Sequence, residues 1–398
     1  MKTGTRNIRL PGTLLAAAML TFVPPGVPTA EASVFGRFSE WFDENLIDPE
    51  DGMLDTSDYL ASAHGFFPAP IIVTEPAVGF GLGAAVAYFH PREELDSEVH
   101  PHKGPPSISV GFAAATDNGT SLYGGAHSGV WKEDHVRYLG AIAGASVNLR
   151  FYPGSKYGDT EDSGIRFNVD GTFLFQQAQF RMKESNWWVG VNYLYINAEN
   201  TFRDAEEEQQ EELPEPTFEF NQAGLGAFVE YDGRNTTFTP TKGLRALLEY
   251  RNYGDTWGSD FDYDHYLGSI FHYTPFGQYS SLGLRLEGET VDGDVPFFGY
   301  PYVSLRGIPA LRYQGESALT AEAEFLWGIT PRWTLVFFGG AGKTTDIGLF
   351  GSDGETVAAG GVGFRYRMAR KLGLQTGVDV ARGPEETSIY LTIGSSWM

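Results

Sequence analysis

The sequence predicts an all-β protein, a transmembrane antiparallel β-barrel of about 16 strands with a short N-terminal amphipathic helix. Three observations predict this fold class. From Pro70 onward, apolar and polar residues alternate with a period of two, as they do in a strand with one apolar face. The candidate strands are long, about 10 to 16 residues, whereas strands of soluble proteins average 5 or 6. Tryptophans gather near the strand ends, which is typical of a girdle at a lipid interface.

Composition excludes several classes of function. The 398 residues carry a net charge of −23, so no basic surface is present to neutralise the phosphates of a nucleic acid. The chain has no cysteine, which excludes disulfides and zinc sites built on thiolates. We expect no metal and no cofactor.

Residues 1–32 have the pattern of a secretory signal peptide. Lys2, Arg6 and Arg9 form a charged start, an apolar run follows at 14–23, and residues 30–32 read Ala-Glu-Ala, a small-x-small cleavage pattern. The apolar run is too short to span a bilayer, and no other stretch approaches the roughly 18 apolar residues that a spanning helix needs. We therefore expect an exported protein, either soluble in the periplasm or crossing a membrane as a barrel.

Residues 33–65 form a segment of different character. Apolar residues recur at helical spacing between charged ones, which predicts a short amphipathic helix; they are Phe35, Phe38, Trp41, Phe42 and Leu46. The apolar stripe suits either a membrane interface or packing on a neighbouring element. An acidic run follows at 48–55. Its glycine stands at the fifth position, where a calcium-binding EF-hand loop needs it at the sixth, so we favour a tight acidic turn over a calcium site.

Residues 66–398 form the predicted barrel domain. The sequence contains these candidate strands: 77–90, 106–117, 120–131, 135–152, 164–182, 187–202, 217–232, 242–254, 261–274, 278–291, 318–328, 332–342, 356–368, 372–382 and 387–397. A barrel with both termini on one side needs an even number, so we expect one further strand within 135–182.

Alternation alone fits a soluble sandwich as well as a barrel, and two further features favour the barrel. The tryptophans near strand ends are Trp187, Trp188, Trp327, Trp333 and Trp397. Tight turns such as Asp117-Asn118-Gly119 coexist with long polar loops at 92–105 and 203–216. Membrane barrels combine short turns at one end with long loops at the other.

The stretch from Pro296 to Leu326 contains the candidate functional site. Its centre is Leu305-Arg306-Gly307-Ile308, followed by Arg312 and Tyr313. The strand that follows carries Glu322 and Glu324 on the same face as Thr320. An arginine next to a glycine in a long loop suits a guanidinium that is buried against carboxylates with the backbone packed close.

These residues resemble the Arg-Gly-aromatic loop of the BamA/TamA superfamily of outer-membrane assembly barrels. The resemblance implies a loop that folds back into the barrel, with Arg306 meeting Glu324 and Glu322. Two more segments resemble the superfamily, a strand–turn–strand motif and a C-terminal barrel signal; their matching residues are Asp232, Arg234, Pro240 and Gly243 for the first, and Gly394 and Trp397 for the second.

Three departures from the superfamily pattern change what the resemblance implies. Ile308 stands where an aromatic residue is expected, and Gly340 stands where an aspartate partner of the arginine is expected. Arg306 is thus expected to rely on Glu324 as its main partner. The segment from Ser33 to Gly65 is too short for a periplasmic POTRA module, so we expect a short member without such modules.

Catalytic candidates are weak. His127 and Ser128 are neighbours on one strand, so they point to opposite faces and cannot form a base–nucleophile pair. The chain has no Gly-x-Ser-x-Gly motif. His100 and His102 lack a nearby carboxylate cluster, and the acidic residues between 204 and 215 are dense enough to form a solvated loop. We expect no enzymatic activity.

The resemblance implies an outer-membrane protein that inserts or translocates polypeptides, or remodels lipids. Its partners would be outer-membrane lipids and unfolded outer-membrane or secreted chains. We expect a weak seam between the first strand, near 79–88, and the last, because Gly79, Gly81 and Gly83 thin the first strand. A passive channel for small solutes and a structural or adhesive barrel are the alternatives.

Overall fold

The computed structural model describes residues 46–57, 65–75, 77–90, 107–151, 165–203, 217–346, 348–349, 351, 354–371 and 373–397. The chain divides into two compact units, residues 1–62 with 368–372 and residues 63–367 with 373–398. The predicted signal peptide, the amphipathic helix except for its last residue, Leu46, and the acidic run at 204–215 lie outside the described residues. Within these ranges no helix combines the length and the apolar character needed to cross a membrane.

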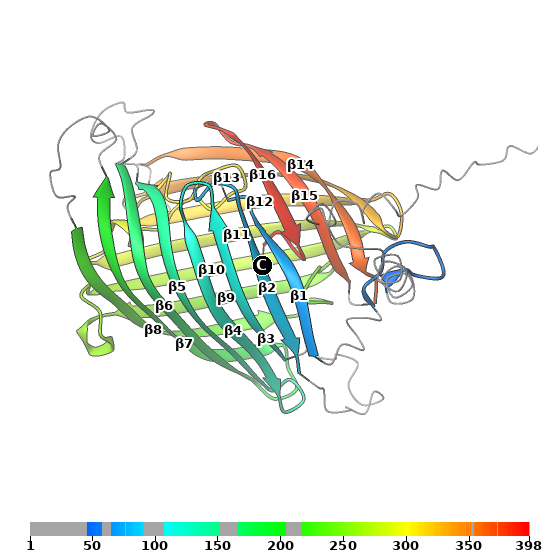
Figure 1. Ribbon diagram of the computed structural model, residues 1–398, viewed down its shortest axis with the longest axis horizontal. Helices are drawn as coiled ribbons and strands as arrows, with labels where there is room; N and C mark the ends of the chain where they lie inside the picture. The colour runs from blue at the N-terminus through cyan, green and yellow to red at the C-terminus, as the bar shows by residue number, and fades with distance from the viewer. Residues whose placement is uncertain are drawn as a thin grey trace, which may run out of the picture. The chain divides into compact units, whose positions relative to one another are not determined.

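The larger unit is built on one antiparallel sheet of 16 strands in strict chain order, as Figure 1 shows. The strands are β1 (Gly65–Val73), β2 (Gly81–Phe89), β3 (Ile108–Thr116), β4 (Ser121–Trp131), β5 (Val136–Phe151), β6 (Ile165–Arg181), β7 (Trp187–Arg203), β8 (Thr217–Asp232), β9 (Gly243–Tyr253), β10 (Tyr263–Phe276), β11 (Ser280–Gly293), β12 (Ser317–Gly328), β13 (Trp333–Thr345), β14 (Thr356–Ala369), β15 (Leu374–Arg382) and β16 (Thr387–Ile393). In the described connections, short 3₁₀ turns form η4 (Asp255–Trp257) and η5 (Phe297–Gly299). The predicted fold class is confirmed, a nearly closed barrel of 16 strands.

The expected extra strand is not within 135–182, where β5 and β6 each run unbroken. It is β1, which precedes the first candidate strand and pairs with β2 from Gly65↔Phe89 to Val73↔Gly81. Pro68 and Pro70 hide β1 in the sequence because proline is depleted in strands. Proline is tolerated on an edge strand, where the missing N–H points away from the neighbour, and β1 is an edge strand.

Because the additional strand is β1, the connections also lie at other ends of the sheet than expected. Because antiparallel strands alternate in direction, the connection after β2 and the connection after β7 lie at opposite ends of the sheet. The end with the short connections at 132–135, 182–186, 277–279 and 329–332 is called the girdle end here. The opposite end, called the loop end, carries the connections at 254–262 and 294–316. The strands that precede the long segments at 92–105 and 203–216, β2 and β7, therefore end at opposite ends of the sheet, contrary to expectation.

The side chains alternate as the period of two predicts. Leu248, Leu284 and Val362 are exposed on the outer face, at 65%, 45% and 53%. Residues of the opposite parity, on the inner face, include charged pairs such as Arg251 with Glu249 at 2.6 Å. An apolar outer face with charges turned inward is the pattern of a membrane barrel.

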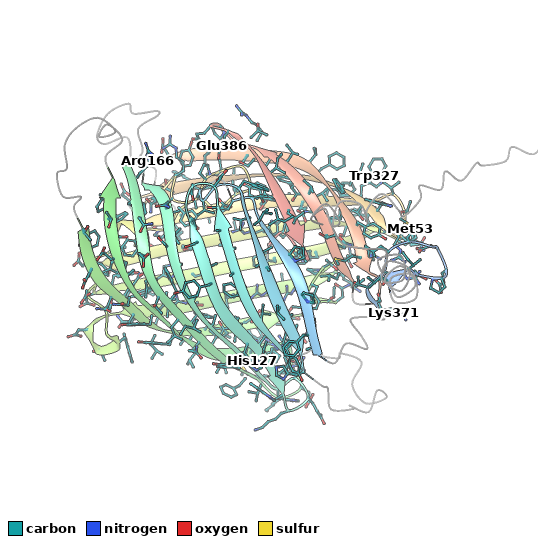
Figure 2. All side chains as sticks on the ribbon, viewed as in Figure 1. Met53, His127, Arg166, Trp327, Lys371 and Glu386 are labelled. Atoms are coloured by element: carbon teal, nitrogen blue, oxygen red, sulfur yellow. The ribbon has the colours of Figure 1, made fainter. Side chains whose placement is uncertain are left out.

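The tryptophans separate into two groups. Trp131, Trp187, Trp327 and Trp333 lie next to the turns of the girdle end and are 40% to 52% exposed, as expected for a girdle. Figure 2 labels Trp327 in this group. Trp188 is only 1% exposed and lies on the inner face, where the Cζ atom of Arg137 is 4.1 Å from its ring centre. The prediction that Trp188 belongs to the girdle was wrong, because adjacent strand residues face opposite sides.

The smaller unit contains the acidic turn expected at 48–55. Ile47 and Leu54 form an isolated bridge that closes it. Its carboxylates bind a guanidinium: Arg370 Nη2 lies 2.8 Å from Asp48 Oδ2 and 2.8 Å from Glu50 Oε2. The main chain adds a contact, since Thr56 N donates to Met368 O at 2.6 Å.

Candidate functional site

The connection between β11 and β12, residues 294–316, returns on itself as a narrow hairpin. Tyr302 and Gln314 form a bridge, and Val303 N donates to Tyr313 O at 3.0 Å. At its tip, Ile308 N donates to Leu305 O at 3.0 Å, which closes a turn. Gly307 has φ +93° at the third position of this turn, where a residue with a side chain is strained. The turn therefore presents Arg306 and requires the glycine after it.

The hairpin packs inside the barrel on strands without side chains to obstruct it. Val303, Leu305, Ile308 and Tyr313 form a buried cluster with Val357 of β14. A Cβ atom at Gly342 would lie 2.3 Å from Val303, and one at Gly340 would lie 2.8 Å from Leu305. These glycines of β13 thus admit the hairpin, which explains why the position expected to hold an aspartate holds Gly340.

A second close approach fixes the arginine–glycine pair. Gly383, in the connection between β15 and β16, is so near that a Cβ atom there would lie 2.1 Å from Gly307 O. Gly307 N donates to the hydroxyl of Tyr390 on β16 at 2.9 Å. The tip is therefore held against the last two strands as well as against β12 and β13.

Arg306 meets three carboxylates. Its Nη2 lies 2.8 Å from Glu322 Oε1, and its Nη1 lies 2.7 Å from Glu324 Oε2 and 2.7 Å from Asp379 Oδ2. Its Cζ atom lies 3.6 Å from the ring centre of Phe338. The arginine side chain is 10% exposed and those of the carboxylates 2%, 7% and 0%, so the cluster is screened from bulk water. Buried ion pairs of this kind hold one geometry and are costly to break.

The sequence pattern indicates Glu322 and Glu324 but not Asp379 of β15, which is 73 positions away from Arg306. The expectation that one carboxylate is the main partner was therefore wrong. Asp379 also binds Arg365 of β14 in a bidentate pair, at 2.5 and 2.8 Å. No local signal identifies Asp379, because curvature of the sheet brings β12 and β15 to the same loop.

Further charges surround the cluster and compensate each other. Arg285 Nη2 donates to Glu287 Oε1 at 2.5 Å, and its Nη1 lies 3.6 Å from Glu322 Oε2. Arg285 Nη1 also donates to the backbone carbonyl of Ser304 in the hairpin at 3.0 Å. Arg312 Nε lies 3.5 Å from Glu385 Oε1 in the connection before β16. The hairpin is thus tied to the wall by its backbone and by its side chains.

The C-terminal residues join the same network. β16 ends at Ile393, and Gly394 turns the chain with φ +82°. Ser396 Oγ donates to Glu324 Oε2 at 3.0 Å, and Trp397 Nε1 donates to Glu322 Oε2 at 2.7 Å. The strand was expected to continue to Trp397 with its indole in the girdle. That expectation was wrong, because the positive φ at Gly394 directs the indole inward.

The indole of Trp397 lies against β11 at a position with no side chain. A Cβ atom at Gly283 would lie 2.7 Å from the Trp397 ring. The same ring contacts Phe271 and Tyr273 of β10 at centroid distances of 6.2 and 6.0 Å. Ser396 and Trp397 are therefore held on the inner face of β10, β11 and β12, and they link β16 to the carboxylates that bind Arg306.

The strand–turn–strand motif lies at the girdle end, between β8 and β9. Arg234 Nε lies 2.8 Å from Asp232 Oδ1, and Gly243 adopts φ +111° where a Cβ atom would lie 2.2 Å from Gly233 O. Pro240 is buried. The motif therefore forms a closed local turn.

A cavity of about 430 Å³ opens beside the hairpin. Its lining includes Arg306, Tyr302, Tyr390 and Glu75 of the connection between β1 and β2. Burial raises the pKa of the Glu75 carboxyl; the charge of Glu386 raises it further, while a hydrogen bond from the backbone of Ala77 opposes both. Two acidic groups therefore lie close together at the loop end, one before β2 and one before β16.

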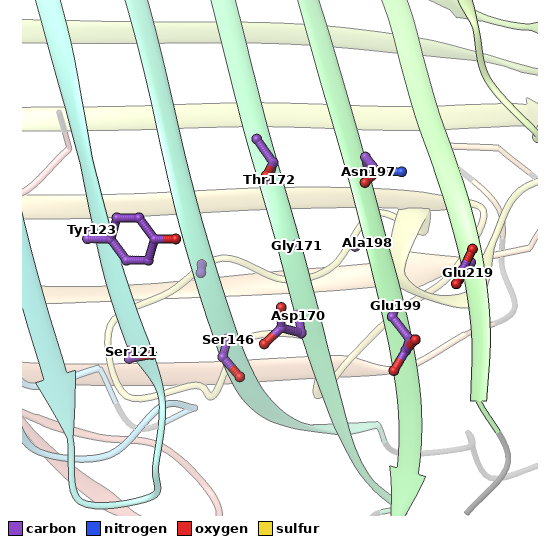
Figure 3. A pocket seen from close by; sticks show the side chains of 11 residues that line it. Ser121, Tyr123, Ser146, Asp170, Gly171, Thr172, Asn197, Ala198, Glu199 and Glu219 are labelled. Carbon is purple, nitrogen blue, oxygen red and sulfur yellow. The ribbon is translucent and has the colours of Figure 1, made fainter.

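A second hollow of about 470 Å³ lies on the outer face near the loop end, as Figure 3 shows. Three carboxylates face it from neighbouring strands, Asp170, Glu199 and Glu219. Asp170 pairs with Glu199, and Glu199 pairs with Glu219, across the ladders. Within the described ranges, no set of three or more metal-ligating side chains is arranged to hold an ion.

The edges of the sheet do not form a ladder with each other. β1 and β16 are the two ends of the strand order, and no pairing joins their described residues. Leu391 N of β16 donates to Thr74 Oγ1, just after β1, at 3.2 Å. Alternate residues of a strand point their N–H groups to the same edge. Pro68 and Pro70 are two positions apart and have no N–H group, so one edge of β1 lacks two hydrogen-bond donors.

This seam differs from the one expected at 79–88. Gly81 and Gly83 lie within β2, an interior strand, where a Cβ atom would come within 2.5 and 2.3 Å of carbonyl oxygens of β3. They allow close contact between β2 and β3 and do not weaken an edge.

No family model and no curated protein matches the chain. Solved structures do. The crystal structure of BamA from Haemophilus ducreyi lacking POTRA domains 1–3 aligns with a TM-score of 0.54 and 12% identity, over 83% of this chain and 69% of that one. CdiB from Acinetobacter baumannii aligns with a TM-score of 0.52 and 9% identity, over 82% of this chain and 59% of that one. The chain therefore has the barrel fold of BamA and CdiB, which is the fold that the resemblance in its sequence implied.

Proposed function

We propose that this protein is an outer-membrane barrel that opens at the seam between β1 and β16 to insert or translocate polypeptide segments. The observation that carries the proposal is the seam at which no ladder joins the described residues of β1 and β16. An edge strand offers unpaired backbone groups that can pair with a strand from another chain. In β1 two of its N–H groups are replaced by Pro68 and Pro70, so closing this seam completely is less favourable than closing an ordinary ladder.

Three observations support the membrane location and the role. The outer face is apolar and the inner face is charged and paired, which suits lipid outside and a polar interior. The fold is shared with BamA and with CdiB. The hairpin that carries Arg306 is attached to β12, β13, β15 and β16, so its position depends on the last strand at the seam. Its partners under this proposal are membrane lipids and unfolded polypeptide chains.

The test is a disulfide across the seam. Thr74→Cys with Leu391→Cys joins two residues that are in contact, in a chain that has no other cysteine. The matched control, Val380→Cys with Ile389→Cys, links β15 and β16 across a ladder that is already complete. Both proteins are reconstituted in phospholipid vesicles, and the folding of a urea-denatured small outer-membrane barrel is followed by its gel mobility.

Oxidation is expected to abolish the assistance given by the seam pair and to leave the control pair active, and reduction is expected to restore activity. Equal activity of the oxidised seam pair would count against lateral opening. In cells, depletion followed by a protein and lipid inventory of the outer membrane would identify the client. The proposed role for Arg306 is conformational, because its positive charge is held in ion pairs with Glu322, Glu324 and Asp379.

A passive channel makes a different prediction. The hairpin that carries Arg306 packs inside the barrel, so ions in a channel would have to pass beside it. Planar-bilayer recordings distinguish the two: a steady, large and ion-selective current that increases when residues 303–313 are deleted would favour the channel over polypeptide insertion.

A further inference from the structure

A serine on the outer face of the barrel lies between two histidines. Ser109 Oγ of β3 is 2.8 Å from His90 Nε2 and 2.9 Å from His127 Nδ1. His127 is opposite Ser109 in the β3–β4 ladder, and Tyr88 is opposite Ser109 in the β2–β3 ladder. Ser128, which follows His127 in the sequence, is on the other face of β4. The fold therefore supplies a serine–histidine pair that the sequence order conceals.

This cluster lies at the level of the girdle. His90 directly follows the end of β2, Ser109 is the second residue of β3, and His127 lies near the end of β4. Figure 2 shows His127 toward that end of the strands. The ring centres of His127 and the girdle residue Trp131 are 6.2 Å apart. An aromatic girdle lies at the headgroup boundary of a membrane, so the cluster is placed where the ester groups of phospholipids lie.

The hydrogen bonds require the two imidazoles to play different parts. Ser109 Oγ has one hydrogen, so it donates to one imidazole and accepts an N–H from the other. A hydroxyl within hydrogen-bond reach of a neutral imidazole is the arrangement of an activated nucleophile. His90 and His127 pack edge to face with ring centres 5.2 Å apart, which holds both rings in place around Ser109.

Next to the serine, on the side away from the girdle, the outer face is bare. Gly111 pairs with Gly125, two positions beyond Ser109 and two before His127. A Cβ atom at Gly111 would meet nothing within 4 Å, and one at Gly125 would meet only Val110 O at 3.3 Å. Exposed apolar side chains border this notch, Val86 at 45% and Ile142 at 55%. An acyl chain can lie in the notch while its ester reaches Ser109 Oγ.

We propose that Ser109, His90 and His127 form a lipid-facing acyl-transfer site that takes the ester of a glycerophospholipid. Polar and ionisable groups facing lipid are costly, and they commonly mark function. The orientation of a bilayer lipid matches the site: the headgroup lies toward the girdle and Trp131, the ester at Ser109, and the acyl chain over the glycine notch.

The chemistry needs only water as a co-reactant. Ser109 Oγ attacks the ester carbonyl carbon, and its proton passes to the imidazole that accepts its hydrogen bond. The other imidazole, whose N–H is donated to Oγ at rest, donates it to the carbonyl oxygen as that oxygen gains charge. The carbon–oxygen bond to glycerol breaks, and the alcohol takes the proton from the imidazolium. Water then attacks the acyl-serine with the same imidazole as base, which releases the fatty acid and restores Ser109.

The first experiment is labelling of the folded protein in phospholipid vesicles with an alkyl fluorophosphonate, which phosphonylates an activated serine with loss of fluoride. Mass spectrometry is expected to find the label on Ser109 and to find none on Ser109→Ala. His90→Phe and His127→Phe are expected to reduce the labelling rate by about 10²–10⁴-fold, the usual range for a general base. Ser128→Ala, on the inner face, is the matched control and is expected to be labelled like the wild type.

The second experiment separates lipid turnover from serine reactivity. Release of fatty acid and lysophospholipid is measured in phosphatidylethanolamine and phosphatidylglycerol vesicles. Gly111→Leu fills the notch, and a Cβ atom at this position meets nothing within 4 Å, so the variant is expected to keep the label and lose lipid turnover. Each variant is first checked for the heat-dependent gel shift of a folded barrel.

No labelling of the folded wild type, or equal labelling of Ser109→Ala, would overturn the site; labelling without fatty acid release would overturn the lipid substrate. The seam disulfide does not enter this assay, so the two proposals fail separately.

Discussion

Replacing Arg306 with methionine tests whether the ion-pair cluster holds the hairpin inside the barrel. Methionine keeps an unbranched apolar stem against Phe338 but removes the guanidinium from Glu322, Glu324 and Asp379. Removing one partner of a buried ion pair costs about 3–5 kcal/mol, because the opposite charge stays buried. We expect the loss of unfolding free energy to lie at the lower end of that range, because the carboxylates keep other partners.

Without the guanidinium, the three carboxylates differ in the hydrogen-bond and ion-pair partners that remain to them. Asp379 keeps Arg365 at 2.5 Å, and Glu322 keeps the indole of Trp397 at 2.7 Å. Glu324 keeps a neutral donor, the Ser396 hydroxyl, at 3.0 Å. We therefore expect Arg306→Met to lower the free energy of unfolding by about 3 kcal/mol. Glu324→Gln added to Arg306→Met is expected to recover part of that loss, because it removes the least compensated charge.

The assay is urea unfolding in phospholipid vesicles, followed by tryptophan fluorescence and by the gel shift between folded and unfolded barrels. Arg382→Met is the matched control, since Arg382 is an exposed arginine of β15 that donates to Thr387 Oγ1 at 3.1 Å. Its effect is expected to stay within about 0.5 kcal/mol, as for most surface substitutions. A loss below about 1 kcal/mol for Arg306→Met, or no recovery with Glu324→Gln, would refute the reasoning.

Three further substitutions test separate contacts of the site. Gly383→Ala places a methyl group 2.1 Å from a backbone oxygen of the hairpin tip; it is expected to cost about 1–3 kcal/mol and to expose the hairpin to limited proteolysis, which unchanged protease patterns would contradict. Trp397→Phe keeps an aromatic ring but removes the 2.7 Å hydrogen bond to Glu322, so urea unfolding should show a loss of about 1.5–3 kcal/mol. Glu75→Gln tests the acidic pair with Glu386. Because the pKa of the Glu75 carboxyl is raised in the folded state, its ionisation destabilises the folded wild type as the pH rises above the ordinary value of 4.5. The variant should therefore unfold at a higher temperature than the wild type at about pH 7 and at a similar temperature at about pH 4, and the same difference at both pH values would exclude this cause.

Local pattern was sufficient for most of the architecture. Each candidate strand in the sequence corresponds to a strand from β2 to β16, because the alternation of side chains depends only on the two-residue repeat of the strand. The same repeat assigned Glu322 and Glu324 to the inner face. It failed for β1, where Pro68 and Pro70 hide an edge strand, and at the C-terminus, where Gly394 turns Trp397 inward.

The sequence by itself determined which face of each strand is apolar, and that Arg306 and Gly307 lie in a turn flanked by inward carboxylates. Only the tertiary structure decided which distant groups meet. Asp379 joins Arg306, and Ser109 lies between His90 and His127, through strand pairing and through the curvature of the sheet. The physical reason is that the face on which a side chain lies is set by alternation along one strand. The distant residues that it contacts are set by the register and closure of the whole sheet.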